Sequence, residues 1–115
     1  MKFITAIIQQ DRVNDVIDEL SKRDVHLVTA TPVLGHGRQK GEAEIYRGHK
    51  EAGRLLKKVK LEIGVNEDFV QPAIDAIKQG AKTGDGQIGD GKIFVFDMQE
   101  CVRIRTGETG SVAIG

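Results

Sequence analysis

Hydrophobic residues in this chain recur with two different periods, and the order of these periods restricts the fold more than any other feature. Four segments are short and rich in apolar or β-branched residues, namely 3–9, 25–34, 55–65 and 92–97. The third also alternates apolar with charged side chains, as a strand with one buried face does. Each segment is therefore predicted to be a β-strand, and Pro32 places the second at a sheet edge or a bulge.

Two segments between the strands carry apolar residues at the spacing of one helical face. These residues are Val13, Val16, Ile17 and Leu20 in the first segment, and Val70, Ala73, Ile74 and Ile77 in the second. We expect Asp11 and Asp68 to cap the two helices, and Gly80 to end the second. Pro72 is expected in the first turn of that helix or at a kink, because proline removes an interior hydrogen bond.

The order β-α-β-β-α-β predicts an α+β ferredoxin-like sandwich, in which a four-stranded antiparallel sheet carries both helices on one face. Apolar strand residues cannot all face two helices, because side chains alternate between the two faces of a sheet. Examples are Ile4, Ala6, Ile8, Val28 and Val95. We therefore expect self-association through the open face, and a ring of three copies is one solution.

Composition excludes several classes of function. Residues 1–115 fit a single domain. With 17 basic and 17 acidic side chains the net charge is zero, so sequence-independent binding to nucleic acid is not expected. Cys101 is the only cysteine, and neither a signal peptide nor an apolar stretch long enough to span a membrane is seen, so a cytoplasmic protein is expected. No Ser/His/Asp set or placed general base indicates an enzyme.

Residues 84–96 form a glycine-dense turn that carries one lysine and continues into an apolar strand. Glycine lets the backbone point several N–H groups at one spot, and Lys92 adds a full charge, so the turn is predicted to bind an anion such as a phosphate chain. A flexible surface loop would have a similar composition. Residues 37–41 and 103–107 look like further parts of the same site, so the chain is predicted to bind a nucleotide.

The spacing from Gly86 to Gly91 and Lys92 also fits a P-loop, but two features exclude that motif. Ile93 follows the lysine, where a Ser or Thr should reach Mg²⁺. The lysine also opens a strand, whereas the lysine of a P-loop opens a helix. The predicted phosphate site therefore belongs to another fold.

Residues 35–54 form a charged, glycine-rich stretch without apolar periodicity. A loop of this length in a small domain is usually functional or disordered. Length and composition alone leave both possibilities open for this loop.

Five short blocks occur in order along nearly the whole chain. They are Gly35–Gly41, Glu44–Gly48, Lys58–Glu62, Gly89–Asp97 and Arg103–Glu108. Together they resemble the PII nitrogen-regulatory signal transduction proteins, which are ferredoxin-like homotrimers with nucleotide sites in the clefts between subunits. The resemblance implies a regulator rather than an enzyme. It also implies a T-loop at about 37–54, a B-loop at about 82–92 and a C-terminal loop at about 103–115.

The resemblance implies two ligand sites in each cleft. The ATP or ADP site would consist of Thr29, Gly35, Gly37, Arg38, Gln39, Glu62, Gly89, Asp90, Gly91, Lys92, Arg103 and Arg105. In the family, the counterparts of Arg103 and Arg105 come from the neighbouring subunit. The site for Mg²⁺ and 2-oxoglutarate would consist of Gln39, Lys40, Gly41 and Lys58. Here Gln39 and the ATP phosphates would hold the metal, and Lys58 would pair with the distal carboxylate of the keto acid.

The resemblance also implies a partner protein, which the T-loop would dock through Tyr46, Arg47 and Gly48. Arg47 matches the residue that family members insert into an ammonium channel. The expected target is therefore a transporter or a nitrogen-assimilation enzyme, with contact to the membrane only through a transporter.

The chain departs from the family pattern in three ways. Glu51 stands where uridylylated members carry their modified tyrosine, so that switch should be absent. Gln9 and Asp11 replace a lysine and an aromatic residue near the oxo-acid pocket, which bears on 2-oxoglutarate binding. The glycine loop is also longer by two residues, which could change the balance between ATP and ADP.

These departures keep a second hypothesis open. Some divergent PII-like proteins are linked to metal efflux or other transport, and such a regulator would not respond to 2-oxoglutarate. The metal ligands to suspect in that case are His36, His49 and Cys101, although their spacing matches no metal motif.

Overall fold

Four strands and two long helices form the domain in the computed structural model, which describes residues 1–37 and 54–115. The strands are β1 (Lys2–Gln9), β2 (Thr29–Gly35), β3 (Leu56–Val65) and β4 (Gly91–Asp97), and the helices are α1 (Val13–Lys22), α3 (Val70–Ala81) and the short α4 (Ser111–Ile114). Two 3₁₀ turns, η1 (Gln10–Arg12) and η2 (Glu67–Phe69), precede α1 and α3. Within the described ranges, no helix combines the length and apolar character needed to cross a bilayer.

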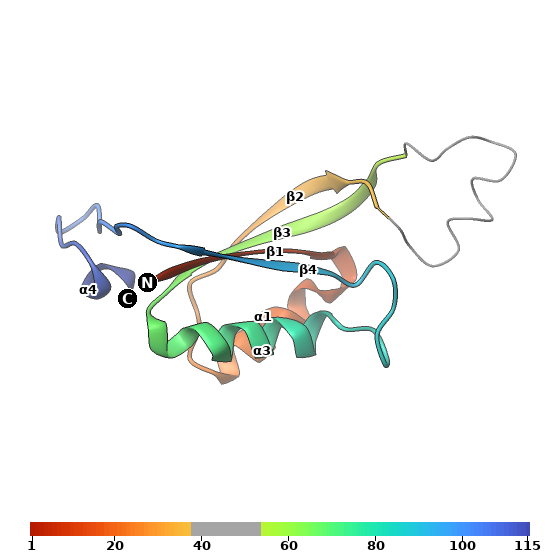
Figure 1. Cartoon of the computed structure of the whole chain (residues 1–115), viewed down its shortest axis with the longest axis horizontal. Coiled ribbons are helices and arrows are strands. Elements are labelled where there is room, and N and C mark those ends of the chain that lie inside the picture. Colours follow the sequence, from red (N-terminus) through yellow and green to blue (C-terminus); the bar gives the residue numbers. More distant parts are fainter. Residues whose placement is uncertain (38–53) are drawn as a thin grey trace, which may run out of the picture.

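The sheet has the strand order β2-β3-β1-β4, and every neighbouring pair is antiparallel. Helices α1 and α3 cover one face of this sheet, and the opposite face carries no helix (Figure 1). This is the ferredoxin-like arrangement that the alternation of strand and helix periods predicted, so the predicted fold class is confirmed.

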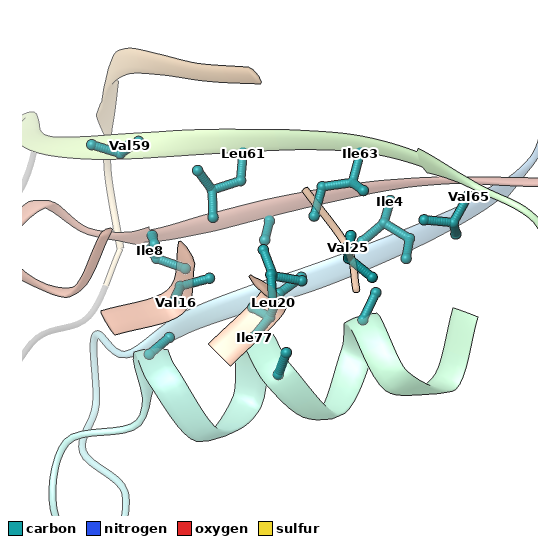
Figure 2. Packing of buried hydrophobic residues seen from close by; sticks show 14 residues of the cluster. Ile4, Ile8, Val16, Leu20, Val25, Val59, Leu61, Ile63, Val65 and Ile77 are labelled. Carbon is teal, nitrogen blue, oxygen red and sulfur yellow. The ribbon is translucent and has the colours of Figure 1, made fainter. Parts of the chain in front are cut away.

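The core lies between the sheet and the two helices (Figure 2). Its largest fully buried side chains are Ile4, Ile8, Leu61 and Ile63 from the sheet and Val16, Leu20 and Ile77 from the helices. Full burial of one such side chain stabilises the fold by about 1.5–3 kcal/mol. This cluster therefore supplies the main free energy that holds the two layers together.

Strand register corrects the prediction about the open face, by which we mean the sheet face away from α1 and α3. Ile4, Ala6 and Ile8 share one parity, so all three face the helices and are buried. Val28 packs against the same core. Val95 pairs with Ile4 and therefore shares its face, although it is 42% exposed on the edge strand β4.

A different apolar set lies on the open face. Phe3 pairs with Phe96, and Thr5 pairs with Phe94, so these side chains point away from the helices. Phe94 and Phe96 are 44% and 55% exposed. Ile7 shares their face because it has the parity of Phe3. The open face is therefore apolar, but the residues used to predict this lie on the helix side of the sheet.

Both predicted helix caps are wrong, because a 3₁₀ turn precedes each helix. Asp11 lies inside η1 and Asp68 inside η2. The N-cap positions of α1 and α3 are Arg12 and Phe69, and neither side chain makes a capping hydrogen bond. Pro72 is the third residue of α3, which confirms its place in the first turn.

The predicted second strand begins late, because α1 ends in a tight turn. Asp24 adopts a positive φ of 61°, and the N–H of Val25 donates to the Leu20 carbonyl at 2.9 Å. These contacts bury Val25 against the core, so β2 begins only at Thr29.

Gly80 lies inside α3, so the prediction that it ends the helix is also wrong. A Cβ at this position would lie 2.6 Å from the Cα of Val16. The glycine therefore permits the close approach of α1 to α3, and the helix continues for one more residue.

Replacement of Gly80 by alanine tests this helix contact. Alanine normally favours a helix by about 1 kcal/mol over glycine. Here the overlap with the α1 backbone should dominate, and we expect Gly80→Ala to lower the free energy of unfolding by about 1–3 kcal/mol. Urea denaturation measures the change. Gly37→Ala is the control, because nothing lies within 4 Å of its Cβ position. A Gly80→Ala protein as stable as the parent would contradict the packing described.

Candidate functional site

Residues 82–90, here called the glycine loop, enter the sheet through a position that only glycine can occupy. Gly91 is the first residue of β4 and has a φ of +119°. A Cβ there would lie 2.0 Å from the carbonyl oxygen of Ile7. The loop therefore ends at a fixed point on the sheet, beside Ile8, which is the register partner of Gly91.

Hydrogen bonds to the Asp90 side chain hold the glycine loop in its folded shape. Asp90 Oδ2 accepts hydrogen bonds from the N–H of Gln87 at 2.8 Å and from the N–H of Thr83 at 3.1 Å. Burial alone would raise the pKa of Asp90, but these backbone donors outweigh it and hold the pKa below its ordinary value. The Asp90 carboxylate therefore stabilises the folded loop, and its Oδ2 is already occupied by backbone donors.

A cleft of about 430 Å³ lies where the glycine loop meets the ends of β2 and β3. It is lined by Ile7, Gly35, His36, Gly37, Leu56, Lys58, Ile88, Gly89, Gly91, Lys92 and Phe94. Six of these were predicted site residues: Gly35, Gly37, Lys58, Gly89, Gly91 and Lys92. We call this space the ligand cleft, because two lysines and a glycine backbone converge on it.

Thr29 and Glu62 lie away from the ligand cleft. They are direct register partners on β2 and β3, and they line a separate hollow with Phe3 and Cys101. Thr29 and Gly35 stand at opposite ends of β2, which places them about 20 Å apart at ~3.3 Å per residue. Within one chain, Thr29 and Glu62 therefore do not line the ligand cleft.

Arg103 lies in the segment that follows β4 and closes a small hairpin. Its Nη1 donates to Glu108 Oε1 at 2.6 Å, and its Nη2 donates to the Val112 carbonyl at 2.7 Å. Arg105 is exposed two residues later. Figure 1 shows this segment at the end of the sheet opposite to the glycine loop. Within one chain, both arginines are thus remote from Lys92.

Several predicted residues fall outside the described ranges. They are Arg38, Gln39, Lys40, Gly41, Tyr46, Arg47, Gly48, His49 and Glu51. Of the suspected metal ligands, His36 lines the ligand cleft and Cys101 lines the separate hollow. Residues 1–37 and 54–115 contain no group of three or more His, Cys, Asp or Glu side chains placed to hold a metal ion.

One contact at the cleft was not predicted. Gln9 Nε2 donates to the Gly89 carbonyl at 3.2 Å, and Lys58 Nζ donates to the same oxygen at 3.2 Å. Gln9 had been noted only because it departs from the family pattern. Its role follows from the strand register, which places it opposite Lys58.

Comparison with known proteins establishes the family. The model of the family "Nitrogen regulatory protein P-II" matches residues 1–108. Nitrogen regulatory protein GlnK1 of Methanosarcina mazei is 48% identical over 114 residues, which cover 99% of this chain and 97% of that protein. Nitrogen regulatory protein GlnK of Escherichia coli K12 is 43% identical, with 99% of this chain and 100% of that protein covered.

A solved structure agrees with these sequence matches. The crystal structure of Arabidopsis thaliana PII bound to citrate superposes with a TM-score of 0.79 at 34% identity, covering 98% of this chain and 88% of that one. The chain belongs to the P-II nitrogen regulatory protein family, as the five sequence blocks indicated. It is accordingly a GlnK-like signal transduction protein and not an enzyme.

Replacement of Asp90 by asparagine tests the loop architecture through its pH dependence. Because folding lowers the pKa of Asp90, its ionised form stabilises the fold above the ordinary value of 3.8, and this contribution is lost as the pH falls through the lowered pKa. We expect Asp90→Asn to be less stable than the parent at pH 7, and the difference to shrink below about pH 4.

Urea midpoints measured from pH 7 to pH 3 give this comparison. Asp85→Asn, which removes the same charge from an exposed position of the loop, is the control. A difference that grows as the pH falls would contradict the role assigned to Asp90.

Proposed function

We propose that the chain binds ATP or ADP in clefts between the subunits of a homotrimer, together with Mg²⁺ and 2-oxoglutarate. In this proposal the ligand set controls the loop at residues 37–54, which docks on a transporter or a nitrogen-assimilation enzyme. The observation that carries the proposal is that the site residues fall into two groups at opposite ends of one sheet. Neither group suffices alone, so a second copy must supply what the first lacks.

The apolar open face supports assembly. Phe94 and Phe96 are about half exposed, and Ile104 in the segment after β4 is 99% exposed. These exposed side chains favour association of copies, because each Å² of apolar surface removed from water lowers the free energy by about 25 cal/mol. A ring of copies would cover these side chains and bring the Arg103 end of one subunit to the ligand cleft of the next.

The chemistry of the joined halves suits a nucleotide. Lys58 and Lys92 face the ligand cleft, and Arg103 and Arg105 would add two guanidinium groups from the neighbour. Charge-assisted hydrogen bonds to phosphate are roughly twice as strong as neutral ones. Arg103 is already oriented by Glu108, so less side-chain freedom is lost when it meets an anion. Thr29 and Glu62, which offer a hydroxyl and a carboxylate, would hydrogen-bond the base.

Lys58 supports an acidic second ligand. Its ammonium group lies in the ligand cleft beside the Gly89 carbonyl, where it could meet the distal carboxylate of 2-oxoglutarate. The described lining offers Mg²⁺ no carboxylate, so its oxygen ligands would come from the phosphates, the keto acid and the Gln39 carboxamide. The relative of solved structure, Arabidopsis thaliana PII, is bound to citrate, and this supports a small carboxylic acid as a ligand.

Control of a partner follows from binding that differs between two loop states. A ligand shifts a conformational equilibrium only when its affinity differs between the states. Residues 37–54 continue directly from Gly35 and Gly37 of the cleft, so a bound ligand can bias them. Tyr46, Arg47 and Gly48 are the proposed docking residues. The names of the relatives point to nitrogen regulation as the controlled process.

Removal of the phosphate-binding cations should weaken nucleotide binding. We expect Lys92→Ala and Arg103→Ala each to cost about 1.5–3 kcal/mol in the binding of Mg-ATP, the range for a hydrogen bond to a charged group. Isothermal titration calorimetry gives the dissociation constants. Lys57→Ala is the control, because this exposed lysine lies next to Lys58 but points to the opposite sheet face. Unchanged affinity in both cleft variants would remove the phosphate assignment.

The same titrations decide between the two regulatory hypotheses. Tighter ATP binding in the presence of 2-oxoglutarate supports the nitrogen sensor, and Lys58→Ala should abolish the effect. A nucleotide response without any effect of 2-oxoglutarate would favour the regulator of another transport system.

Mixing the two deficient proteins tests whether sites lie between subunits. After unfolding and refolding together, Lys92→Ala and Arg103→Ala chains should form mixed rings. Wherever an intact Lys92 meets an intact Arg103, a parental site is restored. We therefore expect a fraction of tight ATP sites in the mixture that neither variant shows alone. Sites complete within one chain would show no such recovery.

A further inference from the structure

The Gly89 carbonyl oxygen accepts two side-chain donors at once. Gln9 Nε2 and Lys58 Nζ each lie 3.2 Å from it. A carbonyl oxygen has two lone pairs, so both hydrogen bonds can form together. These two hydrogen bonds attach the glycine loop to the sheet at Gly89, in addition to its entry into β4 at Gly91.

Strand register explains why these two side chains meet there. Gln9 on β1 and Lys58 on β3 are direct cross-strand partners, so their side chains point to the same face. The Gln9 amide also lies 3.5 Å from Asp90 Oδ1. The other oxygen of Asp90 holds the N–H groups of Thr83 and Gln87. Gln9 thus contacts the residue around which the glycine loop folds.

The two donors differ in their exposure to ligand. Lys58 lines the ligand cleft, whereas Gln9 is not among the residues that line it. A charged ammonium gains more from an anion than from a neutral carbonyl, because charge-assisted hydrogen bonds are the stronger ones. A neutral amide has no such gain. Lys58 can therefore leave Gly89 for an anion in the cleft, while Gln9 stays.

We propose that Gln9 is a positioning residue that holds the glycine loop in its phosphate-binding form when a ligand carboxylate takes Lys58 away from Gly89. This inference rests on the proposed nucleotide site. Gln9 thereby allows the nucleotide and the acid to bind together. When the acid pairs with Lys58, the Gly89 carbonyl still accepts the hydrogen bond from Gln9. Without Gln9, binding of the acid would leave the Gly89 carbonyl with neither donor, and phosphate binding would weaken.

The holding role is tested without any ligand. Amide hydrogen exchange followed by NMR reports the local opening of the loop at Gln87 and Asp90. Loss of one neutral hydrogen bond should speed this exchange about two- to tenfold in Gln9→Ala. Gln9→Glu cannot donate and brings a second carboxylate near Asp90, so it should exceed the alanine variant. Gln9→Lys keeps a donor and should restore parental exchange.

Gln10→Ala is the matched control for these measurements. The residue has the same chemistry and is adjacent in sequence, but its side chain is exposed in η1. Its loop amides should exchange as in the parent. Parental exchange in Gln9→Ala, or faster exchange in Gln9→Lys equal to that of Gln9→Glu, would overturn the holding role.

The coupling is tested by calorimetry with Mg-ATP, titrated with and without saturating 2-oxoglutarate. The ratio of the two dissociation constants measures the coupling between the ligands. We expect 2-oxoglutarate to favour ATP binding about two- to tenfold less in Gln9→Ala than in the parent. In Lys58→Ala the acid should have no effect, whatever residue stands at position 9. An equal ratio in parent and Gln9→Ala would overturn the coupling.

The two tests fail separately. If the parent protein does not bind ATP, the proposed nucleotide function is wrong. The hydrogen-exchange measurements then still decide whether Gln9 holds the loop. If ATP binds but the Gln9 variants match the parent in both measurements, the nucleotide function stands and the role of Gln9 is refuted.

Discussion

The pairing register of β1 is the constraint on which both the core and the site depend. This strand is central, with β3 on one side and β4 on the other, so its register is set from both edges. A slip by one residue would turn Ile4, Ala6 and Ile8 out of the core. The same slip would separate Gln9 from Lys58 and would move Ile7 away from Gly91. Burial of the core therefore also fixes the geometry of the ligand cleft.

In the candidate site, backbone contacts set the shape of the loop, and lysine side chains supply the charge. Asp90 and Gly91 shape the glycine loop with contacts inside the chain, whereas Lys92 is exposed and remains hydrated until a ligand arrives. An exposed cation costs little to maintain, but it also interacts weakly in water. Assembly of the proposed ring would exclude water from the cleft and strengthen the attraction to phosphate. This dependence explains why binding and assembly should be linked in such a protein.

Sequence alone could predict the order of strands and helices, because periods of two and of three to four residues were distinct in each segment. It could not predict details that depend on contacts between segments. Asp11 and Asp68 are good capping residues, but the chain makes a 3₁₀ turn at both positions. Gly80 is typical of a helix end in the sequence, but in the structure a glycine is required there because α1 packs so closely against it. The contact of Gln9 with the loop was hidden because it needs the register and the path of the loop together.

The entry of the glycine loop into β4 has a consequence for how this family can vary. The loop is closed by its own hydrogen bonds around Asp90 and is fixed to the sheet at Gly91. Residues between these points carry no part of the hydrophobic core, since positions 83–88 are all exposed. Length can therefore change there without disturbing the fold. An insertion at this turn would therefore change the shape of the loop while the hydrophobic core keeps its packing.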